Sequence, residues 1–192
     1  KSFKMFLPQD ILKIHRQFKK AGKDLYVVGG AVRDFVQNKQ PNDYDLVTNA
    51  TPDEIKDILS SYRTDLQGQH FGVVRVFTKE NPEGYEIATY RKDIAKGRDT
   101  KGTDKKVDYG KNVTIKDDIQ RRDFTQNALL YDIEKDEIVD LVNGVGDIQN
   151  KKLKTVGQPD KRFEEDRLRI LRAFRFAIKS GSDLDDVIDQ SI

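Results

Sequence analysis

The sequence of 192 residues contains no cysteine, and this absence excludes two kinds of site. Without thiols the chain can form neither a disulfide framework nor a thiolate metal centre, which is typical of a reducing compartment. The sequence also lacks a signal peptide and any run of about 18 apolar residues that could cross a membrane. We therefore expect a soluble, cytoplasmic protein with no membrane partner.

The sequence also lacks a large excess of positive or negative charge. Charged residues make up 35% of the chain, but 35 Lys and Arg against 33 Asp and Glu leave a net charge of only +2. This balance permits a nucleic-acid partner without indicating one, and any basic surface must be local. Because the chain begins at Lys1 without a methionine, we expect a piece of a longer protein.

The order of sequence patterns predicts an α+β fold, with a small mixed or antiparallel sheet, helices and a final helical segment. We found no internal repeat. The charged, glycine-dotted residues 93–118 predict a loop-rich insert. Strands are predicted at 25–28, 44–48, 71–77, 85–90, 128–133 and 137–142. Helices are predicted at 9–21, 31–37, after the capping box TPDE (51–54), at 122–130 and at 162–180.

The stretch LYVVGGAVRD (25–34) predicts a strand that ends at Gly29 and Gly30 and turns into a helix. Such a turn lets backbone N–H groups approach a phosphate closely, and Arg33 in the first helical turn could reach the same phosphates. The alternative is a plain turn in which Arg33 pairs with Asp34. The Walker pattern GxxxxGK[ST] is absent, so this is not a P-loop.

Two aspartates follow this turn, Asp43 and Asp45 in DYDL. On a strand, residues two apart project from one face, and two carboxylates so close repel each other unless a hard cation neutralises them. Mg²⁺ held by one or two carboxylates and by substrate phosphates is the usual solution. A solvated loop is the alternative for DxD alone. Beside the glycine turn, the pair predicts a site for a nucleoside triphosphate and its metal.

Glu86 is the candidate for a third acid. It lies in YEIATY (85–90), where it would point to the face opposite Tyr85 and Ile87. Two metals about 4 Å apart can activate a 3′-hydroxyl and stabilise the leaving pyrophosphate. A solvent-facing glutamate is the alternative.

Two later stretches carry groups that could contact a nucleotide. RRDFTQNAL (121–129) places Arg122 and Asp123 at the start of the predicted helix, where the alternative is a capping cluster. In EEDRLRILRAFRF (164–176), Asp166 and Arg169 are three residues apart and hence neighbours on a helix surface. A carboxylate beside a guanidinium offers the acceptor and donors that the Watson–Crick edge of a base requires. An exposed ion pair is the alternative.

Together these stretches resemble the class II tRNA nucleotidyltransferase and poly(A) polymerase family of the polymerase β-like nucleotidyltransferase superfamily. The resemblance covers residues from about 25 to 180 and includes four motifs in the family's order: VGGAVRD with DYDL, RRDFTQNAL, VNGVGDIQNKKLKTVGQP and EEDRLRILRAFRF. It implies a nucleotidyltransferase head at 1–145 and, at 146–192, a helical neck with the base-templating helix.

The resemblance also implies roles for individual residues. Asp43 and Asp45 would hold catalytic Mg²⁺, and Glu86 is the third catalytic candidate. Nucleotide binding would fall to Gly29, Gly30, Arg33, Arg122, Asp123, Asp166, Arg169, Arg172 and Arg175. In this assignment Asp166 and Arg169 select CTP and ATP. One departure from the family is Gln126, where Ile or Met is usual.

The function implied is addition of CMP and AMP from CTP and ATP to the tRNA 3′ end by two-metal transfer. GQHFGVVRV (68–76) resembles the corresponding strand of CCA-adding members more than that of bacterial poly(A) polymerases. The alternatives are a poly(A) polymerase, a CC- or A-adding specialist, and a non-catalytic nucleotide- or RNA-binding fragment. The family's helical body and tail, which grip the tRNA elbow, are missing from this sequence, and the sequence does not set the oligomeric state.

Overall fold

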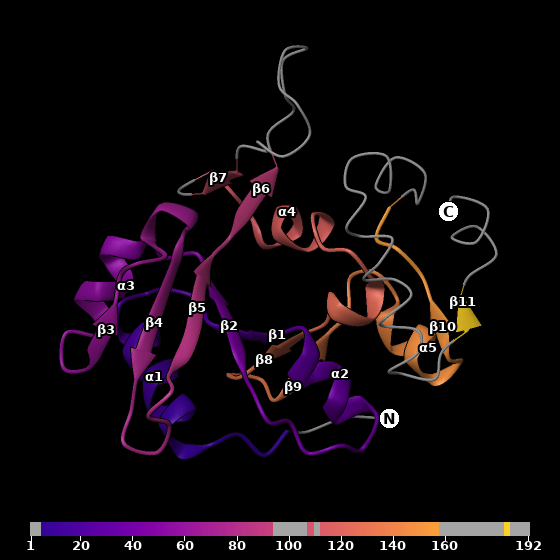
Figure 1. The fold of residues 1–192 in the computed structure, drawn as a ribbon, viewed down its shortest axis with the longest axis horizontal. Coiled ribbons are helices and arrows are strands. Elements are labelled where there is room, and N and C mark those ends of the chain that lie inside the picture. The colour runs from indigo at the N-terminus through magenta and orange to yellow at the C-terminus, as the bar shows by residue number, and fades with distance from the viewer. Residues whose placement is uncertain (1–4, 94–106, 110–111, 158–182, 185–192) are drawn as a thin grey trace, which may run out of the picture.

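One mixed sheet organises residues 5–93, 107–109, 112–157 and 183–184, the residues that the computed structural model describes (Figure 1). Its seven strands follow the order β3-β4-β5-β2-β1-β8-β9, and all neighbours are antiparallel except β2 and β5. The strands are β1 (Tyr26–Val28), β2 (Asp45–Thr48), β3 (Arg63–Asp65), β4 (Val73–Phe77), β5 (Tyr85–Thr89), β8 (Leu130–Asp132) and β9 (Glu137–Val139). This sheet with its helices confirms the predicted fold class.

Three helices cover one face of the sheet: α1 (Gln9–Lys20), α2 (Gly30–Val36) and α3 (Pro52–Ile58). In α1 the apolar residues Ile11, Ile14 and Phe18 recur at helical spacing and are fully buried. They join one core with residues of the sheet that point to the same side, such as Val27 and Ile87. This face therefore carries the main hydrophobic core of the described residues.

Helix α3 begins at the predicted capping box. The Thr51 hydroxyl accepts from the backbone N–H of Glu54 at 3.3 Å, and the Glu54 carboxylate accepts from the Thr51 N–H at 3.1 Å. Pro52 occupies the first helical position, and Ile55 is fully buried. The sequence pattern thus fixed both the start of this helix and its buried side.

The opposite face of the sheet is covered along only part of its length. A second, smaller core forms there from Val47, Ala88, Leu130 and Ile119 among others. Ile119 comes from α4 (Ile115–Gln120), which is followed by the 3-10 turn η2 (Thr125–Asn127). The start of β2 and the start of β5 extend beyond this cover, because Asp45 and Glu86 are exposed. That uncovered part of the face carries the candidate site.

Two predictions about secondary structure are wrong. Residues 122–130 form η2 and the start of β8, not a helix. Their backbone is used elsewhere: the Thr125 N–H donates to the Lys154 carbonyl at 2.9 Å, and the Val156 N–H donates to the Asp123 carbonyl at 3.0 Å. The segment 93–118 is not wholly a loop-rich insert either, because β7 (Val107–Tyr109) pairs with β6 (Arg91–Asp93) and α4 follows.

The end of the described chain packs back onto the sheet. Helix α5 (Gly144–Gln149) crosses the predicted boundary at residues 145 and 146, and its Ile148 is buried in the main core. Strand β10 (Lys152–Leu153) follows and pairs with β11 (Asp183–Leu184). The division into head and neck stays a prediction, and the helix predicted at 162–180 lies outside the described residues.

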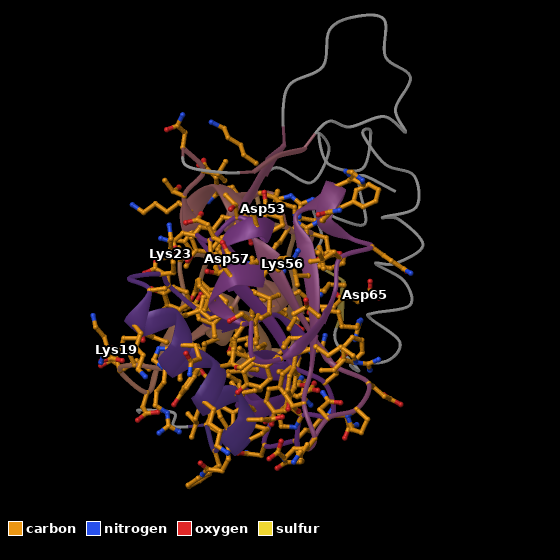
Figure 2. The ribbon with its side chains drawn as sticks, turned by 90° about the vertical axis from the view of Figure 1, so that its left-hand side faces the viewer. Lys19, Lys23, Asp53, Lys56, Asp57 and Asp65 are labelled. Atoms are coloured by element: carbon orange, nitrogen blue, oxygen red, sulfur yellow. The ribbon has the colours of Figure 1, made fainter. Side chains whose placement is uncertain are left out.

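Charged side chains of both signs cover the outer side of α1 and α3, where Figure 2 labels Lys19, Lys23, Asp53, Lys56 and Asp57. One of the ion pairs on this side, Lys23 Nζ to the Glu54 carboxylate at 2.9 Å, ties α3 to the segment before β1. Such exposed pairs contribute at most about 1 kcal/mol each. None of the helices in the described part of the chain is long and apolar enough to span a membrane.

Candidate functional site

Three charged residues form a row across the uncovered part of the sheet. The register places Asp45 of β2 opposite Glu86 of β5, and Glu86 opposite Arg75 of β4. Residues that are opposite each other in neighbouring strands point to the same face. On the other side of Asp45 lies Val28, the last residue of β1, which precedes the Gly29-Gly30 turn. The sheet therefore brings the two early motifs of the sequence side by side.

Asp43 and Asp45 share one side of the chain, as predicted, but not on one strand. Strand β2 begins at Asp45, so Asp43 precedes it. Between them the Tyr44 side chain is buried, 6% exposed, whereas both aspartates are exposed. The buried tyrosine anchors the segment and leaves both carboxylates on its outer side.

The pKa of Asp45 is raised, first because the side chain lies against protein atoms of the sheet, and then because Asp43 and Glu86 add negative charge nearby. Arg122 and Arg75 oppose this effect. Among the described residues, no hydrogen bond or ion pair satisfies either aspartate carboxylate. An added cation would remove the repulsion that raises this pKa, so the electrostatics of the pair favour cation binding.

Glu86 lies beside Asp45 but bonds to a different partner. Its carboxylate accepts from Arg75 Nη2 at 2.8 Å, and Arg75 Nη1 also donates to the Glu83 carbonyl at 3.0 Å. Within the described residues, no group of three His, Asp or Glu side chains is gathered closely enough to hold a metal. The catalytic role of Glu86 stays a prediction.

The Gly29-Gly30 turn joins β1 to α2 by a backbone shape that suits glycine. Gly29 has φ 78°, which L side chains rarely adopt, and its N–H donates to the Leu129 carbonyl at 3.0 Å. At Gly30 an added Cβ would lie 3.6 Å from Nη2 of Arg33, so the guanidinium lies over this turn. Because neither glycine has a side chain, the backbone is uncovered at the point where a ligand phosphate was predicted.

Arg33 already has two partners in the structure. Its Nη2 lies 3.2 Å from the Asp34 carboxylate, which is the alternative that the sequence left open. Its Nη1 also donates to Asn127 Oδ1 at 2.9 Å. Asn127 belongs to RRDFTQNAL, so this bond links two motifs that are 94 residues apart. Phosphate binding by Arg33 stays a prediction.

The arginine motif 121–129 is held by a buried acid that the sequence analysis did not single out. Asp118 is 1% exposed, and its carboxylate accepts from Arg122 Nη2 at 2.9 Å and from the Arg91 backbone N–H at 3.0 Å. Thr114 and Asp117 form a capping box that starts α4, so the pattern TIKD was an available signal for this helix. No local pattern could show that Arg91 also lies here.

Two other residues of this motif have structural partners. Asp123 accepts from the Phe124 N–H at 2.8 Å, a bond to the next residue that caps no helix. Gln126 is fully buried, and its amide donates to the Lys152 carbonyl at 2.6 Å. Glutamine can donate this hydrogen bond, whereas Ile or Met cannot. The residue that departs from the family pattern is therefore bonded to the chain around it. The predicted base-selecting residues Asp166, Arg169, Arg172 and Arg175 lie outside the described residues.

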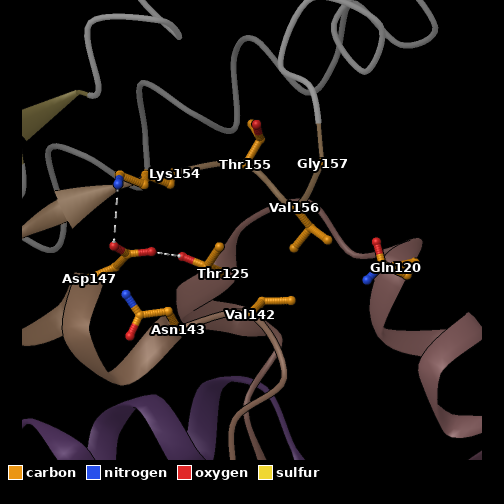
Figure 3. Close-up of a pocket in the computed structure, with 9 residues that line it drawn as sticks. All are labelled: Gln120, Thr125, Val142, Asn143, Asp147, Lys154, Thr155, Val156 and Gly157. Carbon is orange, nitrogen blue, oxygen red and sulfur yellow. Dashed lines mark hydrogen bonds and ion pairs between the residues drawn. The ribbon is translucent and has the colours of Figure 1, made fainter.

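A pocket of about 350 Å³ lies apart from the two aspartates, between η2, α5 and residues 154–157 (Figure 3). On its wall the Thr125 hydroxyl donates to Asp147 at 2.6 Å, and Lys154 Nζ lies 4.0 Å from the same carboxylate. None of the predicted site residues that the structure describes lines this pocket.

Comparisons with known proteins agree with this architecture. The family described as the poly A polymerase head domain matches residues 25–154. Poly(A) polymerase I of Salmonella typhi is 36% identical over 179 residues, which are 90% of this chain and 38% of that protein. The CCA-adding enzyme of Streptococcus uberis is 39% identical over 184 residues, which are 93% of this chain and 42% of that protein. The chain thus spans about two fifths of the length of these curated relatives.

Solved structures show the same fold. The crystal structure of the Bacillus stearothermophilus CCA-adding enzyme in complex with CTP superposes with a TM-score of 0.83 at 34% identity, covering 97% of this chain and 43% of that chain. A tRNA nucleotidyltransferase complexed with a primer tRNA and an incoming ATP analogue gives a TM-score of 0.73 at 27% identity, covering 93% and 48%. The family match covers most of the chain, the described sheet matches that of the CTP complex, and the chain therefore belongs to the poly(A) polymerase head-domain family.

Proposed function

We propose that this chain is the catalytic head of an RNA nucleotidyltransferase that adds CMP and AMP, from CTP and ATP, to the 3′ end of tRNA. One observation carries the proposal: the exposed pair Asp43 and Asp45 lies at the start of β2, directly beside the Gly29-Gly30 turn at the end of β1. This arrangement gives a nucleoside triphosphate a carboxylate pair for its metal and bare backbone for its phosphates.

The donors present fit Mg²⁺. Asp43 and Asp45 offer hard carboxylate oxygens that form no ion pair within the described residues, and the pKa of Asp45 is raised by burial and then by the charges of Asp43 and Glu86. Mg²⁺ is usually held by one or two carboxylates, with substrate phosphates and water as its other ligands. The ion would polarise the phosphoryl oxygens and lower the pKa of an attacking hydroxyl.

The protein's own part is to position the substrates. Gly29 and Gly30 would let the triphosphate approach the backbone, while Arg33 and Arg122 would supply donors to phosphate or ribose oxygens. Asp166 and Arg169 would accept from and donate to the edge of the incoming base, and Arg172 and Arg175 would support the nucleotide. Protein side chains, and not a template strand, would then choose CTP and ATP.

A poly(A) polymerase is the second candidate. Poly(A) polymerase I of Salmonella typhi and the CCA-adding enzyme of Streptococcus uberis have similar identities to this chain, 36% and 39%. The preference for CCA addition rests on the strand segment 68–76. The cytoplasmic location also stays a prediction.

An extension assay separates these functions. The protein is incubated with Mg²⁺ and tRNA lacking its 3′-terminal CCA, with labelled CTP alone, ATP alone or both. CCA addition predicts two C residues with CTP alone and one further A when both are present. Long A tails with ATP alone would identify a poly(A) polymerase. No incorporation from any mixture, with nucleotide or RNA still bound, would indicate a non-catalytic binding fragment.

The base-selecting residues can be tested in the same assay. Asp166→Ala should raise incorporation of UTP or GTP relative to CTP and ATP, because an unsatisfied buried group costs a rejected base about 1–3 kcal/mol. Glu165→Ala, next to it in the sequence, serves as the control and should change selectivity less. An equal slowing of all four nucleotides by Asp166→Ala would show that this residue does not read the base.

A further inference from the structure

Arg91 is a half-buried arginine that the fold holds in place but does not neutralise. Its backbone N–H donates to Asp118 at 3.0 Å, which fixes the position of the residue at the start of β6. Its Nε is buried with no hydrogen-bond partner, and within the described residues its guanidinium forms no hydrogen bond or ion pair. A cation removed from water without a partner is costly, so an anionic ligand is the natural complement.

Charges of both signs surround Arg91. Arg121 and Arg122 lie close enough to lower its pKa further, after burial itself, whereas Asp118 and Glu86 act in the opposite direction. Asp118 is already bonded to Arg122 Nη2 at 2.9 Å, and Glu86 to Arg75 at 2.8 Å. The Nε of Arg122 is also buried without a partner. The Nε atoms of Arg91 and Arg122 are therefore hydrogen-bond donors that the described residues leave unsatisfied.

The strand order shows on which side of the aspartates this cluster begins. Strand β2, with Asp45, lies between β1 and β5. The Gly29-Gly30 turn continues from the end of β1 beside Asp45, whereas Arg91 follows the other end of β5, five residues after Glu86. In an in-line phosphoryl transfer, the attacking hydroxyl and the leaving pyrophosphate lie on opposite sides of the phosphorus. If the glycine turn holds the triphosphate at this end of the β2–β5 pair, Arg91 lies toward the other end, on the side left for the RNA 3′-hydroxyl.

We propose that Arg91 binds a backbone phosphate of the acceptor RNA close to its 3′ end. Its planar guanidinium offers paired donors that match phosphate oxygens. Asp118 acts as a positioning residue for both arginines, since it binds the Arg91 backbone and the Arg122 side chain. This inference rests on the proposed function for the identity of the RNA. The same phosphate chemistry could come from the incoming triphosphate, and the experiment distinguishes the two sources.

The test measures RNA affinity without catalysis. Fluorescence anisotropy gives the Kd for labelled tRNA lacking its 3′-terminal CCA, at several salt concentrations starting from about 50 mM, for the unaltered protein, Arg91→Ala and Arg91→Lys. Arg91→Ala should weaken binding about tenfold, as expected for a lost charged hydrogen bond, and should reduce the slope of log Kd against log salt by about one. Arg91→Lys keeps the charge without the planar donors, so its Kd should be intermediate.

Arg63→Ala is the matched control. It removes the same charge from the edge strand β3, where the guanidinium packs over the Phe77 ring at 4.1 Å, and it should change RNA affinity less than about twofold. Thermal unfolding verifies that each variant is folded, and the KM for CTP is measured at saturating RNA. For Arg91→Ala this KM should change less than twofold.

Three outcomes would overturn the inference: unchanged RNA affinity in Arg91→Ala, an equal loss in Arg63→Ala, or no detectable RNA binding by the unaltered protein. A raised KM for CTP with unchanged RNA affinity would instead assign Arg91 to the triphosphate. If the unaltered protein bound RNA through Arg91 but incorporated no nucleotide, the proposed function would fail while the phosphate site remained.

Discussion

At the scale of single residues, repulsion between carboxylates is the property that marks the site. Asp45 lies against the sheet beside Asp43 and Glu86, and this surrounding raises its pKa. An acid whose pKa is higher in the folded than in the unfolded state stabilises the fold only while it is protonated. That contribution is present below the unfolded pKa of about 3.9 and is lost as the pH rises through the folded pKa.

Asp45→Asn should therefore raise the melting temperature at pH 7, because it removes a charge that the fold disfavours, and should change it little near pH 3. Thermal unfolding followed by circular dichroism at both pH values measures this difference. Glu80→Gln, a change at an exposed turn residue, is the control and should alter stability by less than about 0.5 kcal/mol. A lower melting temperature of Asp45→Asn at pH 7 would show that the carboxylate stabilises the fold.

The Asp118 carboxylate should have the opposite effect on stability, because it stabilises the fold. It is 1% exposed and bonds the Arg91 backbone and the Arg122 guanidinium. Asp118→Ala leaves a buried guanidinium without its partner and should lower the free energy of unfolding by about 3–5 kcal/mol, as denaturant titration would measure. Asp117→Ala, which removes the half-exposed neighbouring carboxylate and its capping bond to Thr114, should cost clearly less. Equal losses in the two variants would contradict a special role for Asp118.

At the scale of elements, the two glycines of the β1–α2 turn have different roles, one in folding and one in the proposed binding. Gly29 needs its positive φ, whereas an added Cβ at Gly30 meets only the end of the Arg33 side chain, at 3.6 Å. The first glycine is required by backbone conformation. The second leaves room, and we attribute that room to the ligand.

Gly29→Ala should destabilise the protein by about 1–2 kcal/mol, since alanine is strained at positive φ. Gly30→Ala should change stability by less than about 1 kcal/mol, yet raise the KM for CTP, because the methyl group covers the backbone at the turn. Denaturant titration and steady-state kinetics measure the two effects. An unchanged KM in Gly30→Ala would mean that no ligand approaches the backbone at this turn.

Some elements could be predicted from the sequence because their signals are local. The helical spacing of Ile11, Ile14 and Phe18, the box at Thr51 and Glu54, and the alternation in β4 each involve residues only a few positions apart. The segment after Arg122 was predicted wrongly because Phe124 pairs with Thr155, across 31 residues of sequence (155 − 124). For the same reason the meeting of Arg91 with Asp118, 27 residues later, gave no signal in the sequence.

At the scale of the whole molecule, the two faces of the sheet are covered to different extents. One face is closed by α1, α2 and α3 around the main core, while the other combines a small core with the uncovered charged row. Residues beyond the predicted head boundary take part in both cores, since Ile148 belongs to the first and Val156 to the second. The cooperative unit should therefore extend past residue 145.

Truncation tests this extent. A chain ending at residue 145 should fail to fold cooperatively, because it lacks Ile148, Leu153 and Val156, which are at most 6% exposed. A chain ending at residue 157 keeps these side chains and should show a single unfolding transition in urea. Cooperative unfolding of the shorter chain would place the boundary where the sequence predicted it.

The most direct test of the central claim, that Asp43 and Asp45 form a metal-dependent catalytic centre, is single-turnover addition of labelled CMP to tRNA lacking its 3′-terminal CCA. The rate is measured with and without Mg²⁺ for the unaltered protein and for Asp45→Asn, after thermal unfolding has shown that both are folded. Metal-assisted transfer contributes several kcal/mol, so the rate should fall about a thousandfold in the variant and without Mg²⁺. A folded Asp45→Asn variant that kept more than about a hundredth of the unaltered rate would contradict the claim.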